Sequence, residues 1–139
     1  MLKTIVTVFS PMVLCAAFSG CFVSGPGPDP DPDPVTAGTL TAGWTLDGYA
    51  TIDVCAYYQV DRVNVVLLDD YGDVIADEEP YCEDFEISFD LSTGWYGAEV
   101  TLLDVGGYAV SDTVFIDDVR VVRDAEVFVD VDFPDAAID

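Results

Sequence analysis

Three aspartates crowd a short segment near the middle of the chain, where they could bind a cation. Asp69, Asp70 and Asp73 surround Tyr71 and Gly72, a composition typical of a tight turn. Calcium takes about six to eight oxygen ligands, which acidic loops can supply. The spacing differs from that of an EF-hand, so calcium binding is one interpretation. The other is an acidic hairpin turn that faces water.

Residue types that many enzymes need are missing from the sequence. The chain contains no histidine, and its only lysine is Lys3. This excludes Ser-His-Asp and Cys-His catalysis, imidazole ligation of zinc, and lysine chemistry in the body of the chain. Carboxylate pairs such as Asp117-Asp118 are too frequent to indicate a glycosidase. We therefore expect a protein that is not an enzyme, with no cofactor unless calcium binds.

Aromatic side chains offer a second kind of site, because an exposed row of rings can stack against sugars. The residues considered for such a platform are Trp44, Trp95, Tyr57, Tyr58, Tyr71 and Tyr108. The alternative is that most of them belong to the core or its rim. Trp44 favours this alternative, because it is in phase with the apolar face of an expected strand.

The charge of the chain limits its partners. There are 27 acidic and 4 basic residues, giving a formal net charge of −23. Binding of nucleic acid requires clustered basic residues, so no nucleic-acid partner is expected. Electrostatic docking to anionic lipid headgroups is disfavoured for the same reason. The acidic surface also favours solubility.

The N-terminal residues 1–21 resemble the signal segment of bacterial lipoproteins. Lys3 precedes an apolar run too short for an ordinary transmembrane helix, and Ser19-Gly20-Cys21 follows. This tripeptide resembles a lipobox, although Phe18 stands where the family usually has Leu or Val. The resemblance implies a signal peptide over 1–20, a lipid anchor on Cys21 and a cell-envelope location. The alternative is an ordinary secretory signal that leaves Cys21 as a free thiol.

The residue after the lipobox bears on the choice of membrane. By resemblance to lipoprotein sorting, Asp at this position would favour the inner membrane, whereas the chain has Phe22. The outer membrane is therefore favoured. Residues 22–34 read FVSGPGPDPDPDP, which excludes helix and central strand. We expect residues 21–35 to be a lipidated cysteine followed by a disordered, extended Asp-Pro tether.

The body of the chain, residues 36–135, alternates apolar and polar residues with the period of β-strands. Expected strands are marked by Leu40 to Leu46, Ile52 and Val54, Val63 to Leu67, Phe85 to Phe89, Tyr96 to Leu102, Val110 to Val122, and Val127 to Phe133. Gly106 and Gly107 indicate a hairpin loop. The prediction is an all-β domain, a single antiparallel β-sandwich of about seven strands.

Two resemblances refine the expected sandwich. Gly94-Trp95-Tyr96 resembles the tyrosine corner of immunoglobulin-like domains, but Ala98 stands where an antibody domain has its second cysteine. A prealbumin-like sandwich, as in carboxypeptidase regulatory-like domains, fits almost equally well. In an oxidising envelope, Cys55 and Cys82 are expected to form a structural disulfide, since their spacing does not match a Cys-x-x-Cys redox pair.

These observations favour a lipid-anchored envelope lipoprotein. Its β-sandwich would be a non-catalytic structural or binding domain whose protein or glycan partner is unknown. The alternative is a calcium-stabilised adhesion module or a carbohydrate-binding module.

Overall fold

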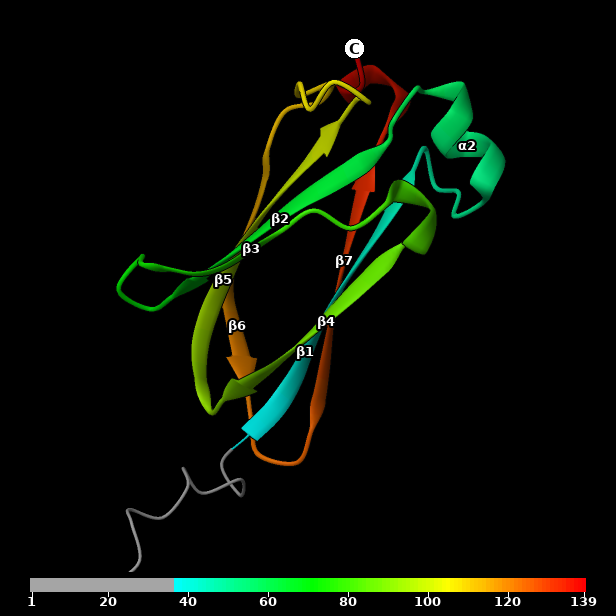
Figure 1. Ribbon diagram of the computed structural model, residues 1–139. Helices are drawn as coiled ribbons and strands as arrows, with labels where there is room; N and C mark the ends of the chain where they lie inside the picture. The colour runs from blue at the N-terminus through cyan, green and yellow to red at the C-terminus, as the bar shows by residue number, and fades with distance from the viewer. Residues whose placement is uncertain (1–36) are drawn as a thin grey trace, which may run out of the picture. The chain divides into compact units, whose positions relative to one another are not determined.

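The computed structural model describes residues 37–139, which form two β-sheets and three short helical segments. The sheets have three and four strands, which confirms the all-β sandwich of about seven strands. Figure 1 shows the start of β1 (Ala37–Leu46) and the C-terminus at opposite ends of the sandwich. The predicted signal peptide, Cys21 and the whole of the Asp-Pro tether lie outside the described residues.

The three-stranded sheet has the order β4-β1-β7, with β1 in the centre. β1 pairs antiparallel with β4 (Glu86–Ser92) and parallel with β7 (Glu126–Phe133). The parallel pair departs from the purely antiparallel sandwich that was expected. Alternating hydrophobicity specifies which face of a strand is buried, but not the direction of its neighbour. Parallel strands need a crossover connection. β7 meets this condition because the chain passes from β6 in the other sheet into β7.

The four-stranded sheet has the order β3-β2-β5-β6, and all its neighbouring strands are antiparallel. Its strands are β2 (Arg62–Asp69), β3 (Val74–Glu78), β5 (Gly94–Leu103) and β6 (Val114–Val121). β3 was not expected from the sequence. It is an edge strand whose residues are mostly exposed, so it lacks the alternation that a buried face imposes.

The strand expected at Ile52 and Val54 is wrong, because these residues belong to the helix α2 (Ile52–Tyr57). Both side chains are β-branched and favour strands. Here tertiary structure overrides that preference: Cys55 is the buried residue of α2 and forms a disulfide with Cys82. Cys82 begins the short 3₁₀ helix η2 (Cys82–Asp84).

The core lies between the two sheets and continues beneath α2. The largest buried side chains come from β1, β2, β5, β6 and β7: Trp44, Phe133, Leu40, Leu46, Leu67, Leu102, Val63, Val65, Val100 and Val121. Trp44 donates a hydrogen bond from its Nε1 to the Cys82 carbonyl oxygen at 3.0 Å. This bond satisfies the one polar atom of a buried indole and ties β1 to the disulfide region.

The topology favours the prealbumin-like alternative over the immunoglobulin-like one. Immunoglobulin sandwiches place their first two strands in one sheet and consist of antiparallel strands. Here β1 and β2 lie in different sheets, and β1 has a parallel neighbour in β7. The tyrosine corner is nevertheless present, because Tyr96 Oη donates to the Ser92 carbonyl oxygen at 2.7 Å.

The packed domain continues beyond residue 135 to the end of the chain. The 3₁₀ helix η3 (Asp135–Ala137) follows β7, and the Asp139 amide donates to the Val110 carbonyl oxygen at 2.8 Å. None of the helices within residues 37–139 has the length and apolar character needed to cross a bilayer.

Candidate ligand-binding site

An open hollow of about 430 Å³ lies at the edge where β2 ends and β5 begins. It brings together three features that are far apart in the sequence. Asp69 and Asp70 come from the end of β2 and its turn, Trp95 comes from β5, and the Asp117-Asp118 pair comes from β6. We refer to this feature as the Trp95 hollow.

A β-bulge places the two β6 aspartates at the hollow. Tyr96 pairs with Val119 and Ala98 pairs with Ile116, so two residues of β6 oppose Gly97 alone. The extra residue is accommodated by a left-handed backbone at Asp118, whose φ is 59°. Bulges re-aim side chains in this way. As a result Asp117 and Asp118 both line the hollow. In a regular strand, these two adjacent side chains would point to opposite faces of the sheet.

Gly97 keeps the floor of the hollow open. A Cβ atom at this position would lie 3.1 Å from the Ile116 carbonyl oxygen and 3.6 Å from Asp117 Oδ1. A larger side chain would therefore occupy the space between Trp95 and the β6 carboxylates. Glycine leaves this space to solvent or to a ligand.

Trp95 forms the aromatic wall of the hollow and is 49% exposed. It pairs across the sheet with Arg120, whose guanidinium carbon lies 5.8 Å from the centre of the indole ring. This is the outer range of a cation–π contact. The interaction leaves a large part of the ring in contact with water.

Tyr96 forms the inner side of the hollow and is held in place by its hydrogen bond to Ser92. Burial raises the pKa of Tyr96, and the charges of Asp70 and Asp69 raise it further. The phenol is therefore neutral at physiological pH. Nearby carboxylates raise the pKa of a phenol because they disfavour its anionic form.

The predicted calcium residues lie in the turn between β2 and β3, where one of them already has a structural role. Asp69 Oδ1 accepts hydrogen bonds from the amides of Tyr71 and Asp73, both at 2.9 Å. Within residues 37–139, no three acidic, cysteine or histidine side chains are grouped as a metal site would require. Calcium binding by Asp69, Asp70 and Asp73 stays a prediction, for which calorimetry with calcium is the direct measurement.

The expected disulfide between Cys55 and Cys82 is present. It joins α2 to η2 across 27 positions of the chain, with the two Cα atoms 6.0 Å apart. Both cysteines are buried, at 3% and 0% exposure. Because the Cys82 carbonyl also accepts the Trp44 hydrogen bond, the disulfide has a structural role.

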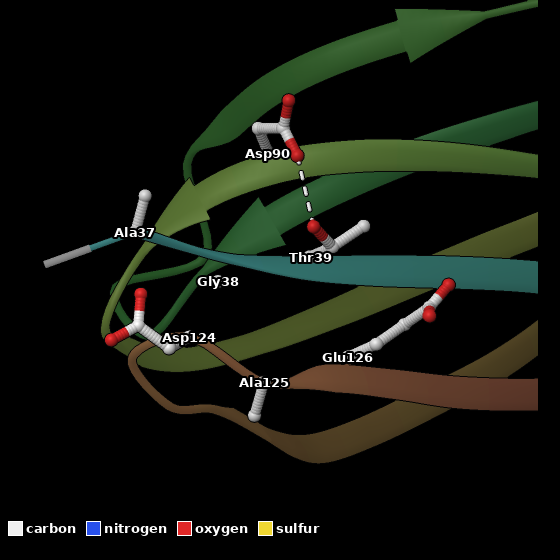
Figure 2. A pocket seen from close by; sticks show the side chains of 7 residues that line it. All are labelled: Ala37, Gly38, Thr39, Asp90, Asp124, Ala125 and Glu126. Carbon is white, nitrogen blue, oxygen red and sulfur yellow. Dashed lines mark hydrogen bonds between the residues drawn. The ribbon is translucent and has the colours of Figure 1, made fainter. Parts of the chain in front are cut away.

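A second depression of about 380 Å³ lies where β1 begins, next to the loop between β6 and β7. Figure 2 shows that its three carboxylates, Asp90, Asp124 and Glu126, point in different directions. Each also has a partner: Asp90 accepts from Thr39, Glu126 accepts from Thr41, and Asp124 contacts Arg123. This depression has no aromatic wall and no converging set of free polar groups, so we regard it as the weaker candidate.

The six aromatic residues proposed as a sugar platform do not form one row. Trp44 is buried in the core, as its phase predicted, and Tyr58 is half-buried against Tyr57. Tyr57, Tyr71 and Tyr108 are exposed but lie on α2, the β2–β3 turn and the β5–β6 loop respectively. Trp95 is the only one of the six that lines the hollow.

Sequence reasoning missed the hollow because it forms only when distant segments pair. One signal was available. Apolar residues alternate at Val114 and Ile116 and then resume at Val119 and Val121, so the phase shifts by one position across Asp117-Asp118. Such a shift indicates a bulge.

Comparisons with known proteins do not assign the chain to a family. No protein-family model matches it, and no curated protein is similar in sequence. A solved structure from Bacteroides thetaiotaomicron VPI-5482, provisionally described as polysaccharide binding (DUF1812), is similar with a TM-score of 0.40 and 10% identity. The match covers 67% of this chain and 46% of that one, so the chain spans less than half of that structure.

Proposed function

We propose that this chain is a lipid-anchored lipoprotein of the cell envelope, whose β-sandwich is a non-catalytic structural or binding domain. The observation that carries the proposal is the segment Ser19-Gly20-Cys21 at the end of a signal-like apolar run. Two or three acyl chains on Cys21 would anchor the protein stably, whereas a single chain binds a membrane only marginally.

The disulfide supports this role for Cys21. The chain has four cysteines, and Cys55 and Cys82 are paired with each other. Cleavage before Cys21 would remove Cys15 with the signal peptide. Cys21 would then be the one cysteine of the mature chain that remains available for acylation.

The start of the domain fits display at the end of a tether. β1 begins at Ala37, shortly after the Asp-Pro segment, which ends at Pro34. Thirteen residues in polyproline-II conformation, at about 3.1 Å each, would span roughly 40 Å.

Metabolic labelling with a clickable palmitate tests the proposal. We expect the native chain to incorporate the label and the Cys21→Ser variant to lose it. Cys15→Ser is the matched control and should label normally, because Cys15 lies within the cleaved segment. Intact-mass spectrometry should show a product that starts at Cys21 with its acyl chains. An unlabelled native chain, or a mature product that starts elsewhere, would overturn the proposal.

The outer membrane is the proposed location, on account of Phe22 in place of Asp. Density-gradient separation of the two membranes tests this directly. The labelled protein should sediment with outer-membrane porins, and recovery with inner-membrane respiratory enzymes would contradict the location without affecting the lipid anchor.

Carbohydrate binding is a second candidate function, favoured by one specific observation. The Trp95 ring is half-exposed in a hollow that also contains carboxylate oxygens. Ligand pockets combine an apolar or aromatic wall with a few polar groups in this way.

A further inference from the structure

We propose that the Trp95 hollow binds a saccharide that carries no acidic group. This inference deepens the carbohydrate-binding candidate by naming the site and the class of sugar. It depends on the domain being a binding domain, and it is independent of the lipid anchor.

The indole of Trp95 supplies the surface for stacking. The two tryptophans of the chain differ sharply in environment, since Trp44 is 2% exposed and Trp95 is 49% exposed. The ring of Trp95 is a rigid apolar surface at the edge of a hollow. The C–H face of a pyranose ring is a flat apolar surface of similar width, so stacking would remove both from water.

Carboxylates beside the ring supply acceptors for sugar hydroxyl groups. Asp70, Asp117 and Asp118 line the hollow and are exposed. Within residues 37–139, none of the three side chains is engaged by a hydrogen bond or an ion pair. An ionised carboxylate is an acceptor only, and hydrogen bonds to it are stronger than those between neutral groups. The vicinal hydroxyl groups of a sugar are hydrogen-bond donors, so they can bond to these carboxylates.

The shape of the hollow is consistent with a small saccharide. Its volume of about 430 Å³ lies within the range of ligand pockets, roughly 300–1,000 Å³. The bulge and the missing side chain at Gly97 leave its floor open toward Asp117. Trp95, Asp117 and Asp118 belong to β5 and β6, and strands hold a site more rigidly than loops do.

The charge of the hollow selects against acidic sugars. Four aspartates line it, and Arg120 is the one basic residue beside Trp95. A uronate or sulfate group placed there would meet like charges at short range, which disfavours its binding. The net charge of −23 repels such polymers at longer range as well.

Acrylamide quenching of tryptophan fluorescence provides a direct test on the full-length protein. The experiment uses micelles of a detergent without a sugar headgroup, such as lauryldimethylamine oxide. Trp44 is shielded and Trp95 is accessible, so bound ligand should reduce the accessible fraction of the emission. The probes are neutral gluco-, manno-, galacto-, xylo- and N-acetylchito-oligosaccharides, with oligogalacturonate as the acidic comparison.

Variants show where the ligand binds. Their affinities are measured by calorimetry, because substituting Trp95 removes the fluorescent residue itself. Trp95→Ala should abolish binding of the positive probe, and Trp95→Phe should restore part of it. Asp117→Ala should weaken binding about tenfold or more, as expected for a lost hydrogen bond to a charged group. Tyr57→Ala is the matched control, since it removes an exposed ring on α2 and should leave Kd unchanged. Unfolding curves followed by tryptophan fluorescence, to which the buried Trp44 contributes in every variant, test whether each variant is folded.

Three results would overturn the inference: no neutral oligosaccharide protects Trp95, oligogalacturonate binds as tightly as the neutral probes, or Trp95→Ala binds as the native chain does. Palmitate labelling remains a separate measurement, so a failure here does not bear on the anchor.

Discussion

The phenol of Tyr58 shows how the acidic surface acts on a single residue. Its Oη donates to Asp135 Oδ1 at 2.9 Å. Burial, this hydrogen bond and the charges of Asp135 and Asp47 together raise the pKa of Tyr58 to about 12. The contact links the residue after α2 to η3, and it exists only while the phenol is protonated.

Stability should therefore fall in strongly alkaline solution as Tyr58 loses its proton. The folded pKa lies above the unfolded value of 10.0, so the folded chain holds the proton more tightly. The contribution of this contact to the free energy of unfolding is complete below pH 10, and it is lost as the pH rises toward about 12. Urea unfolding of native and Tyr58→Phe chains across this window is the measurement. If the Tyr58→Phe chain loses as much stability in alkaline solution as the native chain does, the loss belongs to other groups and the prediction is wrong.

Trp95 and Tyr96 illustrate what residue types alone can predict. Tyr96 was predicted to form a tyrosine corner, because that motif is local and depends on a few adjacent residues. Trp95 was considered only as one of six aromatic residues for a sugar platform, and its position in the hollow beside Asp117 and Asp118 was not predicted. It depends on the pairing of β5 with β6 and on the bulge at Asp117-Asp118.

At the scale of elements, the disulfide secures the region that departs most from the predicted strands. α2 has only six residues, and a helix this short is not stable by itself in water. Cys55 fixes it to η2, and the Trp44 hydrogen bond to Cys82 fixes η2 to β1.

Removing the disulfide should destabilise the domain strongly. For residues 55 to 82, loop-entropy arguments give a loss of about 3.6 kcal/mol, which corresponds to roughly 15 °C in Tm for a domain of this size. Thermal unfolding of Cys55→Ser and of the double variant Cys55→Ser/Cys82→Ser is the measurement. The two should lose similar stability, and an unchanged melting curve in both would contradict a structural disulfide.

The elements divide into those that the sequence pattern specifies and those that it does not. Strands with one buried face, such as β1 and β2, were predicted because burial imposes a period of two. α2 was not, since the disulfide and the packing of Cys55 outweigh local preference. The direction of β7 beside β1 was also beyond prediction, because a hydrophobic pattern is the same for parallel and antiparallel neighbours.

At the scale of the whole molecule, unbalanced charge is the dominant feature. Within residues 37–139 there are two ion pairs, Arg62 with Asp61 and Arg123 with Asp124, at 3.5 and 3.3 Å. All four side chains are substantially exposed, so these pairs contribute little. Most of the negative charge is therefore uncompensated and destabilises the compact state through mutual repulsion.

Added salt should consequently stabilise the protein. Raising sodium chloride from about 0.01 M to about 0.15 M shortens the Debye length from about 30 Å to about 8 Å and weakens the repulsion. We expect Tm to rise, equally for sodium and potassium chloride. Calcium chloride at the same ionic strength separates screening from binding, because an additional rise would indicate a specific calcium site. A Tm that falls or stays constant with sodium chloride would contradict this account.

The parallel pairing of β1 and β7 has a mechanical consequence for a protein held at one end. Eight residue pairs join the two strands, from Thr39 and Glu126 to Leu46 and Phe133. Tension applied at Ala37 and at the far end of β7 pulls the strands in opposite directions along their length. The load is shared by the whole ladder instead of opening one bond at a time. If the chain is held through its N-terminal segment, as we propose, the fold is suited to resist shear between that end of the domain and anything that grips the opposite end.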